Sequence, residues 1–289
     1  MSADLATIRI EDPDDPRIAI YRDIRERDLI RRQGHFIAEG RTVLHVLVDQ
    51  DRFPVHSLLV LENRLAGLSG LLETLPANIP VYCATQPVLD AIAGFHMHRG
   101  ILAIANIPGD TAEMPNEMPA DWKTLLLLSA ISNHDNMGSI FRNAAAFGVD
   151  AVLLDPQCCD PLYRKAVRAS MGGCFKLPYL HAPRWPAELR ELQAAGYRVL
   201  ALHLQGSVAH STAIAAAPGA ADPPPLAVVV GAEYEGVGKE AAEICDARVR
   251  IPMSGAMDTT LDSLNVNVAA AIVLERVFTL NRSPDAAED

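Results

Sequence analysis

The sequence has 289 residues, of which 49% are hydrophobic, so it can bury the core of one large domain or of two ordinary ones. Its net charge of −11 argues against a protein that coats nucleic acid by charge alone. It lacks an apolar run long enough for a membrane span, and we expect no secretory signal in MSADLATIRIEDPDDP. Five cysteines without a C-x-x-C pair predict free thiols in a cytoplasmic protein.

The first part of the chain predicts a small αβ domain, because short apolar runs alternate with amphipathic ones. The predicted elements, in chain order, are a helix within 24–33, a turn at Gly34, a strand near 36–38, a helix within 41–50, strands at 56–62 and 79–84, a helix at 87–95 and a strand at 99–107. Arginines that could serve RNA recognition occur here, at Arg31, Arg32, Arg41 and Arg99.

An acidic, proline-bearing and aperiodic stretch divides the sequence. The predicted organisation is a domain at 1–108, a linker at 109–121, a second domain at 122–282 and an acidic tail at 283–289.

The second domain alternates regularly between apolar strands and helices, which predicts a parallel sheet covered on both faces. We expect strands at 124–131, 151–155, 174–178, 197–204, 226–232 and 247–253, and helices at 138–147, 162–171, 185–196, after Gly236 and at 263–280. Ligands in such sheets bind beyond the carboxyl ends of strands. The loops after Ile131, Val230 and Ile251 are therefore the candidate sites.

The first loop, beginning at Asn133, crowds four polar side chains in front of a predicted helix. From its residue type, Asn136 favours capping the helix that starts near Gly138. Arg142 would lie within about two turns of that helix start. Its side chain either reaches back over the helix end or is simply exposed, and the sequence alone leaves both open.

The second and third loops also admit structural interpretations. Gly231 and Gly236 allow close approach of the backbone to a ligand, but an ordinary glycine turn with acidic capping explains this stretch equally. In the third loop, Ser263 could cap the last helix. Asn265 falls on the helix face of Ala269, where a buried amide would need partners.

Considered together, these segments resemble the three motifs of the SpoU (TrmH-like) RNA 2′-O-ribose methyltransferases of the SPOUT superfamily. The matching residues are Asn136-x-Gly138-x-x-x-Arg142, Gly231-Ala232-Glu233-x-Glu235-Gly236, Ile251-Pro252-Met253 and Ser263-Leu264-Asn265-Val266. The resemblance covers roughly 125–280. The first domain is more loosely similar to a ribosomal-protein-like RNA-binding domain.

The resemblance implies a fold, a cofactor and a reaction. The fold would be an α/β methyltransferase domain with a trefoil knot, acting as a homodimer. S-adenosylmethionine would be the cofactor, and a ribose 2′-hydroxyl of tRNA or rRNA would be the methyl acceptor. Residues matching the cofactor site are Gly231, Ala232, Gly236, Ile251, Met253 and Leu264. Residues matching the catalytic centre are Arg142, Asn136, Glu233, Ser263 and Asn265.

Within this hypothesis Arg142 grips the phosphate beside the target ribose and stabilises the developing alkoxide, because a guanidinium stays protonated near neutral pH and is not a resting base. The resemblance also allows this arginine to accept the proton after it contacts the phosphate, and the sequence leaves both roles open. Asn136 and Asn265 would orient the ribose and Arg142, while Glu233 would fix the loop. Three features depart from the family pattern: Tyr234, Asn267 and the extra residues 256–262.

Two other functions are compatible with the sequence. One is an RNA-binding protein that kept the fold and lost catalysis. The other is a nucleotide-binding α/β enzyme such as a dehydrogenase, although the chain lacks a G-x-G-x-x-G fingerprint. No metal site is predicted, since His96 and His98 are only weakly suggestive as a ligand pair.

Overall fold

The computed structural model describes residues 7–22, 26–93, 96–109, 114–115, 117–214, 224–232, 236–254 and 263–281. Its contacts divide the chain into two compact units. Unit 1 comprises the described residues within Met1–Asp110 together with Asp160–Lys176, and unit 2 comprises those within Thr111–Cys159 and Leu177–Asp289. Unit 1 therefore includes a segment that the sequence assigns to the second domain.

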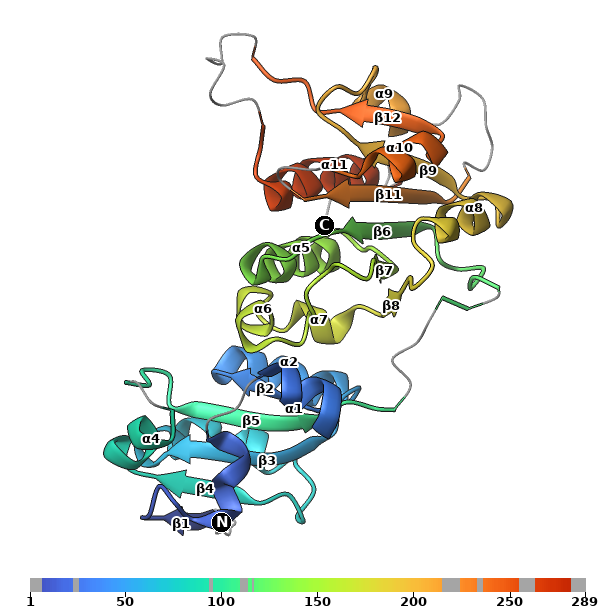
Figure 1. Cartoon of the computed structure of the whole chain (residues 1–289). Helices are drawn as coiled ribbons and strands as arrows, with labels where there is room; N and C mark the ends of the chain where they lie inside the picture. The colour runs from blue at the N-terminus through green and yellow to red at the C-terminus, as the bar shows by residue number, and fades with distance from the viewer. Residues whose placement is uncertain are drawn as a thin grey trace. The chain divides into compact units, whose positions relative to one another are not determined.

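Unit 1 is built on a mixed sheet with the strand order β1-β4-β3-β5-β2 (Figure 1). β1, β4 and β3 run parallel, while β5 pairs antiparallel with β3 and β2. The strands are β1 Thr7–Ile10, β2 His35–Glu39, β3 Val55–Leu61, β4 Val81–Ala84 and β5 Ile101–Asn106. The helices are α1 Glu26–Gln33, α2 Arg41–Gln50, α3 Ser69–Leu72, α4 Gln86–Ala93, α6 Arg164–Ala169 and α7 Gly173–Lys176, with 3-10 turns at Pro16–Tyr21 and Glu62–Leu68.

The alternation of apolar residues predicts four of these strands, and Gly34 has the positive φ of 67° that its predicted turn requires. β1 was not predicted. A strand at 174–178 was predicted wrongly. That segment begins as α7, and the strand that follows is β8, Tyr179–His181. The run CFKLP alternates like a strand, but Gly172, with φ of 84°, starts a turn, which the Phe175 amide closes by donating to the Gly172 carbonyl at 2.9 Å.

Aromatic packing holds α7 in unit 1. The ring of Phe175 lies 5.4 Å from that of Phe36 on β2 and 5.7 Å from that of Phe53, centroid to centroid. Phe36 and Phe53 also meet edge to face at 5.3 Å. All three side chains are buried, so this trio buries apolar area that residues 160–176 would otherwise expose to water.

A buried ion pair joins the same segment to β2. Glu39, at the end of β2, is 6% exposed, and its carboxylate accepts a hydrogen bond from Nε of Arg164 on α6 at 2.9 Å. Arg168 and Arg99 lie farther from the same carboxylate, at 3.8 and 4.0 Å. A carboxylate in this position is tolerated because the nearby guanidinium compensates its lost hydration.

Unit 2 contains, within its described residues, a seven-stranded sheet in which all pairs are parallel, in the order β10-β12-β9-β11-β6-β7-β8 (Figure 1). Its strands are β6 Thr124–Ser129, β7 Ala151–Leu154, β8 Tyr179–His181, β9 Arg198–Leu202, β10 Val208–Ala209, β11 Leu226–Gly231 and β12 Ala247–Arg250. Its helices are α5 His134–Ala146, α8 Ala187–Ala194, α9 His210–Ile214, α10 Lys239–Ile244 and α11 Val266–Asn281. The predicted parallel sheet is confirmed; β10 and α9 were not predicted.

Both faces of this sheet are buried, as the continuous apolar strands predict. On one face, Leu127 and Val229 pack in a cluster with Leu189 and Leu192 of α8. On the other face, residues such as Leu128 are equally buried, and α5 and α11 lie side by side (Figure 1). The described part of the predicted linker joins the first cluster, since Met114 and Met118 pack against it, as does Trp122 directly after the linker.

The buried pair in unit 1 gives a stability prediction. Glu39→Ala should lower the free energy of unfolding by about 3–5 kcal/mol, because it removes one member of a buried, hydrogen-bonded ion pair. Urea titration followed by far-ultraviolet circular dichroism would measure this. Glu62→Ala is the matched control, since Glu62 is exposed and pairs at the surface with Arg9; it should cost less than about 1 kcal/mol. Equal losses in the two variants would contradict a buried role for Glu39.

Candidate functional site

Three strand ends and the start of α11 surround one cavity in unit 2. β12, β9 and β11 are neighbours in the sheet, so their carboxyl ends lie side by side. The cavity at this edge has a volume of about 360 Å³, which is sufficient for a small-molecule ligand. All the predicted cofactor-binding residues line it: Gly231, Ala232, Gly236, Ile251, Met253 and Leu264. Their shared location is shown by the structure, while their binding role stays a prediction.

The loop after β9 forms a wall of this cavity that the sequence analysis missed. His203, Leu204 and Gln205 line it. The amide of Gln205 donates to Nδ1 of His203 at 3.1 Å, and the turn is closed by a bond from the Gly206 amide to the His203 carbonyl at 3.0 Å. Like the three candidate loops, HLQG places polar residues and a glycine after an apolar strand. However, only the strand order reveals that β9 lies between β11 and β12.

The structure gives Gly231 the role of a tight glycine turn, one of the two interpretations that the sequence left open. A Cβ at this position would overlap the carbonyl of Gly236 and the amide of Val237. Gly236 lies against the end of β11 through a bridge to Ala232, in which the Gly236 amide donates to the Ala232 carbonyl at 2.8 Å. A branched residue at 231 would therefore displace the loop itself, whether or not a ligand is bound.

The helix after β6 starts earlier than predicted. α5 begins at His134, and Asn133 is its cap: Oδ1 of Asn133 accepts from the amides of Asp135 and Asn136 at 2.9 and 3.1 Å. The prediction that Asn136 caps the helix is wrong, since Asn136 lies within the first turn and is 7% exposed. An asparagine before a second polar residue is the better capping signal here, because Asp135 also favours the first turn.

A buried carboxylate shapes the loop between β6 and α5. Asp155, 3% exposed and directly after β7, accepts from the hydroxyl of Ser129 at 3.1 Å and from the amide of Ala130 at 2.9 Å. Its other oxygen accepts from the amides of Gln157 and Cys158. These four bonds hold Ala130 at its positive φ of 56°. The sequence analysis did not select Asp155, because a lone aspartate at a strand end has many ordinary roles.

The start of α11 also differs from the prediction. The helix begins at Val266, and Oδ1 of Asn265 accepts from the Asn267 amide at 3.0 Å while its carbonyl accepts from Ala269. Asn265 is thus exposed at the helix start, and it is neither buried nor on the helix face. Ser263 is exposed ahead of the helix and does not cap it, although it lines the cavity.

Arg142 lies on the exposed side of α5. It is separated from the buried Asn136 by roughly 120° around the helix axis, so the two side chains do not converge within one chain. Neither residue lines the cavity. However, Nδ2 of the adjacent Asn143 donates to the carbonyl of Asn267 at 3.1 Å. This bond places the first turn of α11 beside the turn of α5 that carries Arg142.

The predicted residues Glu233, Tyr234 and Glu235, the extra stretch 256–262 and the acidic tail 283–289 lie outside the described residues.

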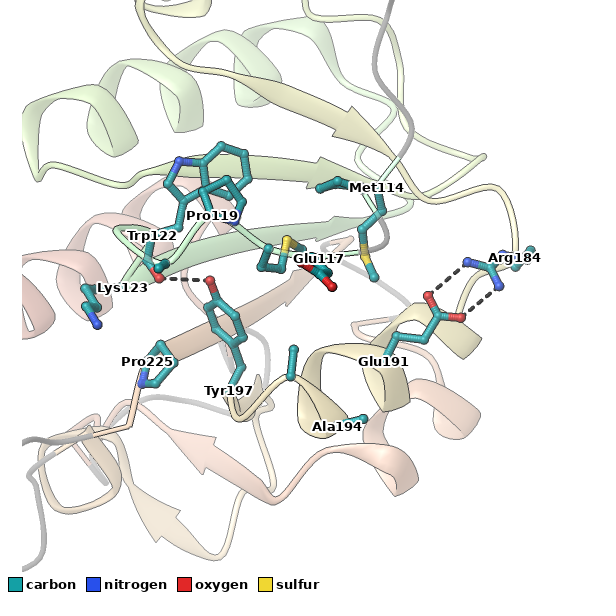
Figure 2. Close-up of a pocket in the computed structure, with 14 residues that line it drawn as sticks. Met114, Glu117, Pro119, Trp122, Lys123, Arg184, Glu191, Ala194, Tyr197 and Pro225 are labelled. Atoms are coloured by element: carbon teal, nitrogen blue, oxygen red, sulfur yellow. Dashed lines mark hydrogen bonds and ion pairs between the residues drawn. The ribbon is translucent and has the colours of Figure 1, made fainter.

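A larger cavity, of about 700 Å³, lies at the amino ends of strands in the unit 2 sheet (Figure 2). Lys123, Tyr197 and Pro225, each just before a strand, line it. The Tyr197 hydroxyl donates to the Trp122 carbonyl at 2.8 Å, and a dashed line marks this bond in Figure 2. Arg184 and Glu191 form a two-pronged pair at the cavity's side, at 2.8 and 2.9 Å. Because parallel sheets bind ligands at carboxyl ends, size alone does not make this the candidate site.

The cysteines offer no reactive nucleophile among the buried positions. Burial raises the pKa of the Cys174 thiol to about 12, and partial burial also raises the pKa of the half-buried Cys158 thiol well above its ordinary value. Both are therefore protonated near neutral pH, where a thiol is a poor nucleophile. Across the described ranges, no three His, Cys, Asp or Glu side chains gather so that they could hold a metal ion. No helix in this part of the chain has the length and apolar character to cross a bilayer.

Comparison with known proteins is consistent with this architecture. A Mycobacterium tuberculosis protein, described as an uncharacterized tRNA/rRNA methyltransferase, is 40% identical over 266 residues, which cover 90% of this chain and 88% of that protein. The AdoMet-bound rRNA methyltransferase of Sinorhizobium meliloti has a similar fold, with a TM-score of 0.77 at 23% identity over 96% of this chain and 99% of its own. A solved RNA 2′-O ribose methyltransferase gives a TM-score of 0.75 at 26% identity, over 94% and 99% of the two chains.

The sequence profile of the SpoU rRNA Methylase family matches residues 123–275, a little over half of the chain. This stretch contains all three loops in which the polar and glycine residues were recognised. The chain therefore belongs to the SpoU rRNA methylase family.

Proposed function

We propose that this protein transfers a methyl group from S-adenosylmethionine to the 2′-hydroxyl of a ribose in tRNA or rRNA. Membership of the SpoU family and the tRNA/rRNA methyltransferase description of its relative support an RNA methyltransferase. The 2′-oxygen as acceptor is supported by the three sequence motifs and by the solved ribose methyltransferase of similar fold.

One observation carries the proposal: the start of α11 both lines the cavity and adjoins the turn of Arg142. Leu264 and Ala269 line the cavity, and the bond from Asn143 to Asn267 fixes α11 against α5. The start of α11 would thus contact a ligand in the cavity and would also lie beside the turn of α5 whose Arg142 holds a phosphate. The cofactor and the RNA would meet where Asn265 caps that helix.

The residues of the cavity fit S-adenosylmethionine. Apolar side chains such as Leu202, Val230 and Val266 offer surfaces for an adenine, while the glycine-containing loop after β11 brings backbone groups to the cavity wall. Gly231, Ile251 and Leu264 would hold the adenine and ribose through their backbone groups. When bound, the cofactor supplies a methyl group activated on a sulfonium sulfur.

Arg142 would act on the RNA. Within the described residues it forms no ion pair, and its exposed guanidinium can make a planar two-pronged contact with a phosphate. Fixed beside the target ribose, the same charge would stabilise the oxygen as the hydroxyl loses its proton. Asn265 would orient the ribose. Asn136, being buried, would serve by holding the start of α5 rather than by touching RNA.

Several properties of the family complete the proposal: a trefoil knot in the methyltransferase domain, a homodimer with the active site near its interface, a first domain that binds RNA, and a cytoplasmic location. Sedimentation at several protein concentrations would test the dimer.

The cavity gives a prediction about cofactor binding. In the absence of RNA, Ala269→Leu should raise the Kd for S-adenosylmethionine by about tenfold or more. The larger leucine side chain would extend into the part of the cavity that the cofactor is proposed to occupy. Val268→Leu is the matched control, since Val268 lies next to it on α11, is 44% exposed and does not line the cavity. Calorimetry on both folded variants is the measurement. Unchanged affinity in Ala269→Leu would place the cofactor elsewhere.

Arg142 gives the catalytic prediction. Arg142→Ala should leave cofactor affinity intact and lower the single-turnover methylation rate by roughly 10²–10⁴, the range for loss of a charge-stabilising group. Arg142→Lys should restore it only in part, because a point charge does not copy the planar contact.

Arg190→Ala, at another exposed arginine on a helix of unit 2, is the control for this experiment and should keep the parent rate. Labelled cofactor and bulk RNA serve as substrates. A rate within about threefold of the parent for Arg142→Ala would mean that this arginine is not catalytic.

A further inference from the structure

Unit 1 contains a cavity of about 480 Å³ that is rich in arginine. Arg41, Arg64, Arg99 and Arg168 all line it, and all four side chains are exposed to solvent. They come from four separate places in the chain: the start of α2, the 3-10 turn after β3, the loop before β5, and α6. This convergence is produced by the fold and is not visible as a basic run in the sequence.

The first turn of α2 opens into the same cavity, where Gly40, Thr42 and Val43 are also lining residues. The cap residue Gly40 has no side chain to accept from the first amides, and the first turn has no acidic residue. It carries Arg41 instead, whose positive charge adds to the positive end of the helix dipole. An arginine at this position is unfavourable for the helix unless an anion lies nearby.

The negative charge in this region does not balance the arginines. Glu39 is the carboxylate at this end of β2, and its short contact goes to Arg164, at 2.9 Å. Arg168 and Arg99 share the same carboxylate at 3.8 and 4.0 Å. Among the described residues Arg41 and Arg64 have no acidic partner, and Arg64 donates only to the carbonyl of His98, at 3.4 Å. The cavity therefore keeps an excess of positive charge.

Close packing holds one of the arginines over the helix start. Gly40 has φ of 98°, and a Cβ there would come within 3.1 Å of Nη1 and 3.2 Å of Cδ of Arg99. The guanidinium of Arg99 thus lies against the backbone that leads into α2. Guanidinium groups and free helix amides around one hollow are the donors that bind phosphate oxygens.

We propose that this arginine cavity binds a phosphodiester group of the RNA substrate, an inference that rests on the proposed function. Arg168 belongs to the stretch that matches the SpoU family, whereas Arg41, Arg64 and Arg99 precede it. The phosphate site is thus shared between the first domain of the sequence and the segment Asp160–Lys176, which the Glu39–Arg164 pair attaches to β2.

The test measures binding of a fluorescein-labelled RNA hairpin to the full chain by anisotropy, over a series of KCl concentrations. Arg41→Gln and Arg99→Gln should each weaken binding, and each should reduce the slope of log Kd against log salt by about 0.7–0.9, the value for one lost phosphate contact. Arg41→Lys should keep the slope. Arg9→Gln is the matched control, because Arg9 is an exposed arginine of unit 1, on β1, outside the cavity.

Circular dichroism would establish that each variant is folded, which the exposure of these side chains favours. A loss of slope in Arg9→Gln equal to that in the two cavity variants would overturn the location, and unchanged slopes in the cavity variants would overturn the site. Calorimetry with S-adenosylmethionine separates this inference from the proposed function. A chain that shows the arginine-dependent slope but binds no cofactor would retain the phosphate site and lose the methyltransferase assignment.

Discussion

The parallel alignment of the strands in unit 2 is the constraint on which the candidate site depends. The carboxyl ends of parallel strands lie on the same side of a sheet. The loops that follow the neighbouring strands β12, β9 and β11 are therefore brought together although they are far apart in the chain. Burial of both sheet faces fixes the register of those strands. The cavity is consequently built by loops on a rigid sheet, and its composition can vary without disturbing the core.

Two buried carboxylates provide a second level of organisation. Asp155 accepts from donors of both the β6 and the β7 loops, and Glu39 joins β2 to α6 across 125 residues of sequence. Four donors offset the loss of hydration of Asp155, and the guanidinium of Arg164 does so for Glu39. Such residues touch no proposed ligand, but they set the backbone from which the ligand-facing groups project.

The segment Asp160–Lys176 shows that a boundary in sequence and a boundary in packing can differ. It falls inside the stretch that matches the SpoU family, yet its contacts place it in unit 1. A chain that starts near Pro119 would lose Phe36 and Phe53 and would expose the apolar ring of Phe175. Removal of the first domain is therefore a poor way to separate RNA binding from catalysis, whereas substitution of single exposed arginines leaves the packing intact.

The sequence by itself determined the existence of the main elements and the family. Apolar strands alternating with helices are a local property, and the three motifs are read from order and spacing, so neither requires knowledge of distant contacts. It also selected six residues that prove to line one cavity.

Only the tertiary structure decided which loops are neighbours, where helix ends fall and which way side chains face. The turn at Gly172 overrode the strand-like alternation of CFKLP, because Phe175 gains its burial against β2. Asn133 and Asn265 cap helices at positions set by packing of α5 on α11. The wall at His203 and the arginine cavity depend on strand order and on long-range approach, and local residue patterns carry no information about either.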